Sequence, residues 1–164
     1  MTTPSSPSPG PKSAPADEDA PPLASPMGFG GLIPFFICAG TAHSGVAPWA
    51  GLALVISGVY GAVILSFVGA VHWGLAMQSD RSPAWFVWSI LPALYAWPPI
   101  VFLDTRTALL ALVPGFIISW NVDRRAAKAG LIPRWYMQLR TMLTLGAAMG
   151  LTAASLAPPP FLHG

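Results

Sequence analysis

The chain has 164 residues, of which 54% are hydrophobic and only 9% are charged, and its mean hydropathy is +0.59. An ordinary soluble domain carries about a quarter charged residues, so this composition excludes a water-facing surface and predicts a lipid bilayer as the surroundings. The net charge of +2 comes from one basic loop and not from a basic stripe with interleaved aromatic residues, which excludes nucleic acid as a partner.

The first 26 residues differ in composition from the rest of the chain. They are rich in Pro, Ser and Ala and contain one lysine and three acidic residues. Such a segment cannot bury enough apolar surface to offset the entropy of ordering it, so we expect residues 1–26 to be disordered. They have neither the apolar core of a secretory signal nor the arginines of a mitochondrial presequence.

Five apolar segments follow and predict an all-α membrane bundle of about five transmembrane helices over residues 27–157, with a short outer tail at 158–164. The expected helices cover about 28–41, 49–78, 84–103, 107–122 and 136–157. Because a spanning helix needs roughly 20 residues, the second, third and fifth segments qualify and the other two are short. Strands are not expected, since period-2 alternation is absent and lipid favours helices.

Proline and glycine mark the expected helix boundaries. Pro83 and Pro133 precede the third and fifth segments, where a missing N–H costs little, and Gly130 suits a helix end. The third segment also contains Pro92, Pro98 and Pro99, which predict kinks in a membrane helix.

The distribution of basic residues predicts the orientation. With five spans, seven of the eight Lys and Arg residues share a side with the amino terminus, and Arg106 lies on the other side. The positive-inside rule then places the amino terminus in the cytoplasm. Most of these basic residues belong to an expected basic cytoplasmic loop, namely Arg124, Arg125, Lys128, Arg134 and Arg140. Any ion pair that Asp123 forms with a nearby arginine there would contribute little to stability if it is exposed.

Small residues recur at four-residue steps in the second and fifth segments. Such steps let two membrane helices approach closely, so we predict that these two segments pack on each other, with Ala70 opposite Gly146 as a test pair. The predicted packing residues are Gly58, Ala62, Gly69, Ala70, Gly74, Gly146 and Gly150.

The second segment also carries the candidate functional polar site, which consists of Tyr60, Ser66, His72 and Trp73. His72 lies on the small-residue face, about 9 Å from the end of its segment. Two interpretations are open: a neutral imidazole that bonds to a neighbouring helix, or a functional ionisable group within the membrane. An intrachain haem site needs two histidines at similar depth within the spans, but His43 and His163 are expected outside and His72 near the cytoplasmic side. The single cysteine, Cys38, is expected to be a small buried hydrophobic residue. We therefore expect no metal and no cofactor.

Three blocks of the sequence resemble the transmembrane protein 69 family, which is also described as a bacterial domain of unknown function. The blocks are GLIPFF at 31–36, YGAVILSFVGAVHWGLAM at 60–77 and GLIPRWYMQLR at 130–140. The resemblance covers about residues 28–157 and implies a helical membrane protein without an established activity, so it supplies no catalytic residues. The matching positions are Tyr60, Gly61, Ser66, Phe67, Gly69, Trp73, Pro133, Trp135, Tyr136 and Arg140.

Together these features favour a non-enzymatic protein of the bacterial inner membrane that acts through helix contacts as an accessory or assembly component. Its partners would be the lipid bilayer and either another membrane protein or a second copy of the chain. A small transporter or channel with a path near His72 and the proline-kinked third segment is the alternative, although no acidic residue lies inside an expected span. A membrane enzyme acting on lipid or quinone is a third hypothesis, but no catalytic template is present.

Overall fold

The computed structural model describes residues 19–78 and 83–159, and these residues form helices and no β-strand. Residues 1–18 of the expected disordered tail, the link at 79–82 and residues 160–164 of the expected outer tail lie outside the described residues. Residues 24–26 of the expected tail belong to the first helix. The helices are α1 (Ala24–Gly30), α2 (Ile33–His43), α3 (Trp49–Gln78), α4 (Pro83–Phe102), α5 (Thr105–Lys128) and α6 (Arg134–Ser155). The predicted all-α class is confirmed.

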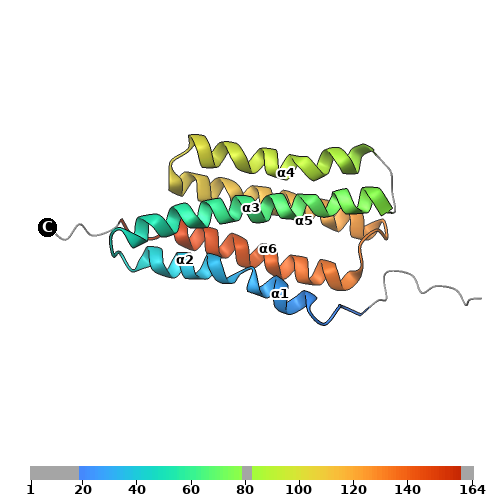
Figure 1. The fold of residues 1–164 in the computed structure, drawn as a ribbon, viewed down its shortest axis with the longest axis horizontal. Helices are drawn as coiled ribbons and strands as arrows, with labels where there is room; N and C mark the ends of the chain where they lie inside the picture. Colours follow the sequence, from blue (N-terminus) through green and yellow to red (C-terminus); the bar gives the residue numbers. More distant parts are fainter. Residues whose placement is uncertain (1–18, 79–82, 160–164) are drawn as a thin grey trace, which may run out of the picture.

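The long helices lie side by side and alternate in direction along the chain (Figure 1). Helix α3 runs through the middle of the bundle and contacts α2, α4, α5 and α6, while α2 and α5 also pack on α6. The end of α3, the start of α4, the end of α5 and the start of α6 therefore meet at one end of the bundle (Figure 1). We call it the basic end, because Arg124, Arg125, Lys128 and Arg134 lie there.

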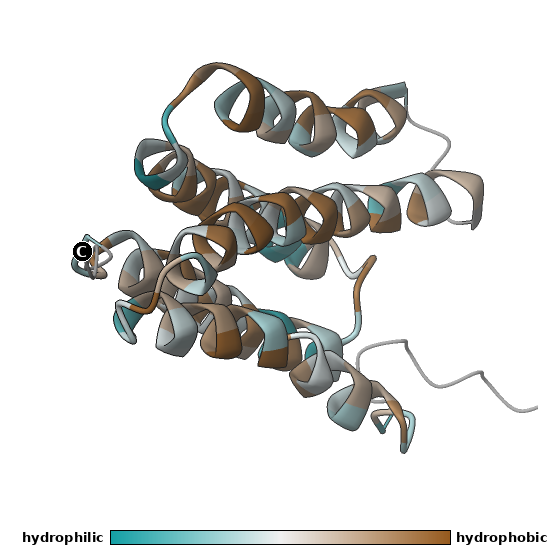
Figure 2. Cartoon of the chain, turned by 60° about the vertical axis from the view of Figure 1, so that its left-hand side comes forward, coloured by the Kyte–Doolittle hydropathy of each residue, from teal (hydrophilic) through white to brown (hydrophobic). Residues whose placement is uncertain are grey.

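Among the described residues, four segments are long and apolar enough to cross a membrane: Ala24–His43, Trp49–Met77, Pro83–Phe102 and Thr105–Lys128. The expectation that the first and fourth apolar segments are short was wrong, because the fourth continues past Val122 to Lys128 and the first includes α1. Helix α6 corresponds to the fifth segment, which was expected to qualify as a span, but it is not among these four. It runs alongside them over 22 residues (Figure 1). Hydrophobic residues recur along each long helix (Figure 2).

The first membrane segment is interrupted at Gly31 and Leu32, between α1 and α2. The interruption leaves the Gly31 carbonyl without a helical partner, and the Tyr60 hydroxyl on α3 donates a hydrogen bond to it at 2.9 Å. The Tyr60 ring also packs edge-on against Phe35, with ring centroids 5.0 Å apart. Tyr60 therefore holds the break in the first segment against the centre of the bundle.

Three residues expected to mark helix boundaries lie at helix ends. Pro83 is the first residue of α4, Pro133 is the N-cap of α6, and α4 stays helical through its three prolines. Gly130 follows the end of α5 with φ +76°, a left-handed conformation that suits glycine.

The core is apolar in its centre and the outer surface is apolar as well. Leu65, Leu109 and Leu112 are fully buried, whereas Phe67 is 69% exposed and Leu94 is 61% exposed. A soluble protein rarely exposes such large contiguous apolar surface, so the outer side chains face lipid. This arrangement agrees with the membrane class expected from composition.

Helices α3 and α6, which are the second and fifth predicted segments, do contact each other, but several of the small residues predicted to join them lie against other helices. Added methyl groups at Gly146 and Gly150 would meet Leu32 and Phe35 of the first membrane segment, not α3. On α3, Gly69 lies against the backbone of α4, and Ala70 is exposed. Small residues allow close approach, but they do not encode which helix approaches.

Candidate functional site

His72 is fully buried on α3, six residues before the helix ends at Gln78. Two tryptophans of α4 enclose it. The indole of Trp85 stacks on the imidazole with centroids 5.4 Å apart, and Trp88 packs edge-on at 6.5 Å. Helix α4 therefore covers His72, and the imidazole faces the inside of the bundle.

Asp123 lies beside His72 and is also fully buried. Its Oδ1 is 3.1 Å from Nε2 of His72. Asp123 was expected in an exposed cytoplasmic loop, and that expectation was wrong, since α5 continues to Lys128 and turns this side chain inward. An acidic residue therefore does lie inside a membrane helix, contrary to the expectation that none would.

Arg140 of α6 completes the site. Its Nε donates to Oδ2 of Asp123 at 2.7 Å, and its Nη1 donates to the Thr144 hydroxyl at 2.7 Å. That hydroxyl in turn donates to the Arg140 carbonyl at 2.9 Å. Arg140 was expected in the basic loop, but it lies within α6 and is only 4% exposed.

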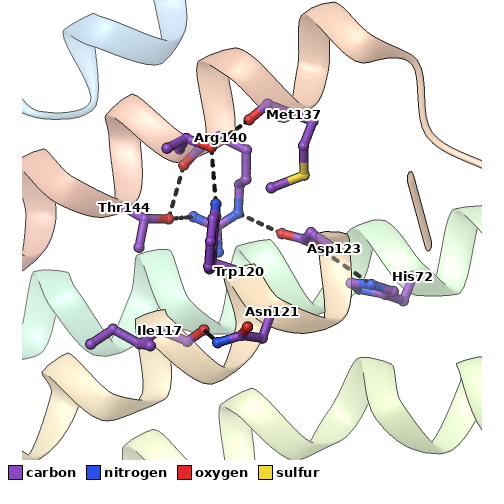
Figure 3. A network of polar contacts seen from close by, with 9 residues as sticks. His72, Ile117, Trp120, Asn121, Asp123, Met137, Arg140 and Thr144 are labelled. Atoms are coloured by element: carbon purple, nitrogen blue, oxygen red, sulfur yellow. Dashed lines mark hydrogen bonds and ion pairs between the residues drawn. The ribbon is translucent and has the colours of Figure 1, made fainter. Parts of the chain in front are cut away.

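The three ionisable side chains join three helices, as Figure 3 shows for α3, α5 and α6. We call this cluster the His72–Asp123–Arg140 network. The Asp123 carboxylate neutralises the Arg140 guanidinium at short range, and this is the condition under which a buried charge is tolerated. The network lies toward the basic end, because Arg140 is about 9 Å from the start of α6 at 1.5 Å per residue.

The network retains unused hydrogen-bonding capacity. Nδ1 of His72, Nε1 of Trp88 and Nη2 of Arg140 are buried and have no hydrogen-bond partner among the described residues. Within the same part of the chain, no group of three His, Cys, Asp or Glu side chains could hold a metal ion. The Trp88 and Arg140 nitrogens are N–H donors, which suit an oxygen acceptor better than a metal ion.

The remaining residues of the candidate polar site do not join His72. The Ser66 hydroxyl donates to the Ala62 carbonyl one turn earlier on its own helix, at 2.8 Å. Trp73 is 44% exposed and packs on Phe86, and Tyr60 lies at the break in the first segment. The structure therefore separates these three residues from the network.

The other four residues of the expected basic loop lie on helices. Arg124, Arg125 and Lys128 are exposed in the last turns of α5, and Arg134 begins α6. The guanidinium of Arg124 lies 5.5 Å from the centre of the Trp120 ring. These cations are available to lipid headgroups or solvent, whereas Arg140 is not.

One signal in the sequence points to Asp123. Leu109, Leu112, Phe116, Ser119 and Asp123 recur at three- and four-residue steps, and all five are buried on α5. A helical stripe that continues through an acidic residue places the carboxylate on the inner face. The partner Arg140 occupies the corresponding inner face of α6, but no local pattern joins the two residues.

The chain matches the family described as "Protein of unknown function (DUF3429)" over residues 20–156. It belongs to this family. The "Transmembrane protein 69" of Xenopus tropicalis is 33% identical over 152 residues, which are 89% of this chain. The chain spans 58% of the length of that relative, and no solved structure matches. The resemblance drawn from the three sequence blocks is therefore confirmed.

Proposed function

We propose that the protein is a non-enzymatic accessory or assembly component of a bacterial inner-membrane complex and binds a transmembrane helix of its partner. The observation that carries this proposal is a groove of about 390 Å³ on the outer surface between α3 and α4. Half of its eight lining residues are Ala or Ser; the lining is Val59, Ala62, Val63, Ser66, Ala93, Ala96, Trp97 and Ile100.

The shape of this groove suits a helix. In lipid, helices associate through close packing and not through apolar burial, and small residues let two backbones approach. Ala62 and Ser66 belong to the four-residue ladder of α3, which continues through the exposed Ala70 to Gly74. A methyl group added to Gly74 would have no neighbour within 4 Å in the part of the chain that the structure describes. This part of the ladder is therefore free for an external helix.

The orientation of the bundle in the membrane is part of the same proposal. Arg124, Arg125, Lys128 and Arg134 gather at the basic end, while Arg106 lies at the opposite end. The positive-inside rule supports a cytoplasmic basic end and, with it, a cytoplasmic amino terminus. Cysteine labelling of Lys128→Cys and Thr107→Cys in sealed cells tests the assignment, because only Thr107→Cys should react with an impermeant reagent.

A transporter with a path at His72 is the second candidate, and the His72–Asp123 contact favours it, since buried ionisable residues often mark ion pathways. Beyond the network, however, the centre of the bundle is closed by Leu65, Leu112 and Phe116, which are at most 1% exposed. A path across the bilayer would have to open this apolar layer. The closed centre of the bundle and the outer groove therefore favour the accessory or assembly role over transport.

The test is affinity purification of the tagged full chain in mild detergent with three variants. We expect a stoichiometric membrane partner, or a second copy of the chain, with the wild-type protein. The groove-filling variant Ala62→Leu/Ala93→Leu should lose that partner, while Val55→Leu, on an exposed part of α3 outside the groove, and His72→Ala should retain it. Equal capture by the groove variant would contradict the proposal, and solute flux into vesicles that requires His72 would favour the transporter.

A further inference from the structure

The outer side of the α5–α6 pair combines a tryptophan with exposed cations. Nε1 of Trp120 on α5 donates to the Thr141 hydroxyl on α6 at 2.9 Å, and this bond joins the two helices (Figure 3). The guanidinium of Arg124 lies over the same indole, 5.5 Å from the ring centre. Trp120 therefore holds Arg124 on the side of α5 where the two helices meet.

The bond from Trp120 to Thr141 also sets the level at which two further cations lie. Lys128 comes eight residues after Trp120, and Arg134 comes seven residues before Thr141, which is about 10–12 Å along either helix. Residues seven or eight apart share a helix face, so both cations lie on the same side of the pair as the bond. We call this surface the hairpin face; it consists of Trp120, Arg124, Lys128, Arg134, Gln138 and Thr141.

The three cations of the hairpin face are exposed, and none of them forms an ion pair with another described residue. In this part of the chain, the ion pairs are those of Asp123 with His72 and with Arg140, and each oxygen of Asp123 serves one of them. An anion from outside the chain could therefore bind all three cations without displacing an internal partner. Guanidinium and ammonium groups are common ligands of phosphate in proteins.

The residues next to the cations, toward the middle of the helices, are apolar and exposed. Ile117 comes three residues before Trp120 and is 46% exposed, and Leu145 comes four residues after Thr141 and is 59% exposed. A tryptophan between apolar and charged residues is typical of the boundary between hydrocarbon and headgroups. The hairpin face therefore offers apolar contacts and then cations in the order in which a phospholipid presents acyl chains and phosphate.

The charge of the hairpin face distinguishes between classes of phospholipid. A zwitterionic headgroup carries its own ammonium group, which partly neutralises its phosphate and is repelled by the three cations. An anionic headgroup such as phosphatidylglycerol carries no ammonium group, so the full charge of its phosphate is available to them. The hairpin face therefore favours an anionic lipid.

We propose that the hairpin face binds one anionic glycerophospholipid, whose phosphate is held by Arg124, Lys128 and Arg134. Its acyl chains lie along Ile117 and Leu145. The site differs from the general attraction of anionic lipid to basic residues, because it depends on which cations lie beside the contact between α5 and α6 and not on their number.

Arg125 provides the matched control for this proposal. It is exposed like Arg124 and carries the same charge. At about 100° per residue, however, it lies about 100° around α5 from Arg124 and about 140° from Trp120. The Arg125 side chain therefore starts from a part of α5 that does not face the hairpin contact, so its loss removes one charge without removing a ligand of the phosphate.

The experiment measures phosphatidylglycerol binding to the full chain in mild detergent by native mass spectrometry. A detergent micelle without charge removes the attraction that a charged membrane surface would add. We expect one bound lipid with the wild type, a loss of affinity of about tenfold or more with Arg124→Gln, and a change within about twofold with Arg125→Gln. Circular dichroism checks that both variants keep the helical fold.

A second measurement leaves the protein unchanged and varies the ligand. Phosphatidylcholine with the same acyl chains should bind about tenfold or more weakly than phosphatidylglycerol. Raising the salt concentration from about 0.1 M to about 1 M should also weaken phosphatidylglycerol binding, since it shortens the screening length from about 10 Å to about 3 Å. Soluble glycerophosphoglycerol, which has the headgroup without acyl chains, should not displace the lipid at millimolar concentration.

Three results would overturn the proposal. Equal losses with Arg124→Gln and Arg125→Gln would show diffuse attraction, equal binding of both lipids would exclude selection by charge, and displacement by glycerophosphoglycerol would show a site for a free phosphate ester. The hairpin face lies on α5 and α6, whereas the proposed partner groove lies between α3 and α4. The groove variant Ala62→Leu/Ala93→Leu should therefore keep the lipid, so failure of one proposal can be distinguished from failure of the other.

Discussion

Replacing Asp123 with leucine should destabilise the bundle severely, because this carboxylate serves two other buried side chains. It lies 2.7 Å from Nε of Arg140 and 3.1 Å from Nε2 of His72. The substitution leaves the Arg140 cation buried without a counter-charge. Removal of one partner from a buried ion pair costs about 3–5 kcal/mol, and about 4 kcal/mol changes the unfolding equilibrium nearly a thousandfold.

The double variant Asp123→Leu/Arg140→Met provides the decisive comparison. It removes both charges and fills the space with apolar side chains, a replacement that is often neutral for a buried pair. We therefore expect the double variant to be more stable than Asp123→Leu, with a coupling energy of about 2–3 kcal/mol. Arg124→Met is the matched control, and it should stay within about 0.5 kcal/mol of the wild type because Arg124 is exposed.

The assay is reversible unfolding in mixed micelles of mild detergent and dodecyl sulfate, followed by tryptophan fluorescence and helical circular dichroism. The free energies of the wild type, the single variants Asp123→Leu and Arg140→Met, and the double variant form one thermodynamic cycle, and the control Arg124→Met is measured separately. If Asp123→Leu costs no more than Arg124→Met, or if the two single effects simply add, the network does not act as a neutralised buried pair.

Three further predictions concern the helix contacts and ends. Gly69→Ala should lower the free energy of unfolding by about 1–3 kcal/mol, because its methyl group would lie 2.6 Å from the Ser89 carbonyl oxygen. Gly74→Ala has open space among the described residues and should be neutral or slightly stabilising in the same unfolding assay. Hydrogen bonds from Thr107 lower the pKa of the exposed Asp104 at the start of α5. Folding therefore favours the charged carboxylate, and Asp104 contributes to the stability of the folded state at neutral pH. That contribution should disappear as the pH falls through about 3.9 and on below it, and Asp104→Ala should remove this part of the acid dependence of unfolding. Arg106→Met should speed amide exchange in the last turn of α6, because Nη1 of Arg106 donates to the carbonyls of Ser155 and Ala157; unchanged exchange there would contradict this capping role.

Local features of the sequence predicted the helices well. Apolar runs, Pro83, Pro133 and Gly130 determine where helices begin and end through covalent geometry and hydrophobicity, which act within a few residues. The end of α5 was misplaced for a physical reason. A cluster that starts with Asp123 and two arginines resembles a membrane boundary, but the helix continues because its own backbone hydrogen bonds do not depend on lipid.

The candidate site was only half predictable. The position of His72 on an inner face follows from helical periodicity, and the structure gives it a fully buried side chain. Its neighbours come from elsewhere in the sequence: Asp123 is 51 residues away, and Arg140 is 17 residues beyond that. Charge pairing over such separations depends on which helices pack together, and the small-residue ladders do not specify that arrangement.

The network also explains how α6 lies alongside the more apolar helices. Taken alone, α5 and α6 each carry an ionised group within about two turns of the basic end. A charge costs about 2.5–3.5 kcal/mol at the centre of a membrane helix in insertion measurements, and less toward the helix ends. The Asp123–Arg140 salt bridge offsets much of that cost only when the two helices are adjacent. A five-residue connection at 129–133 keeps them adjacent, and Trp120 on α5 donates to the Thr141 hydroxyl on α6 at 2.9 Å. Helices α5 and α6 therefore behave as one antiparallel pair, whose charges compensate each other and whose joint inner face receives His72 from α3.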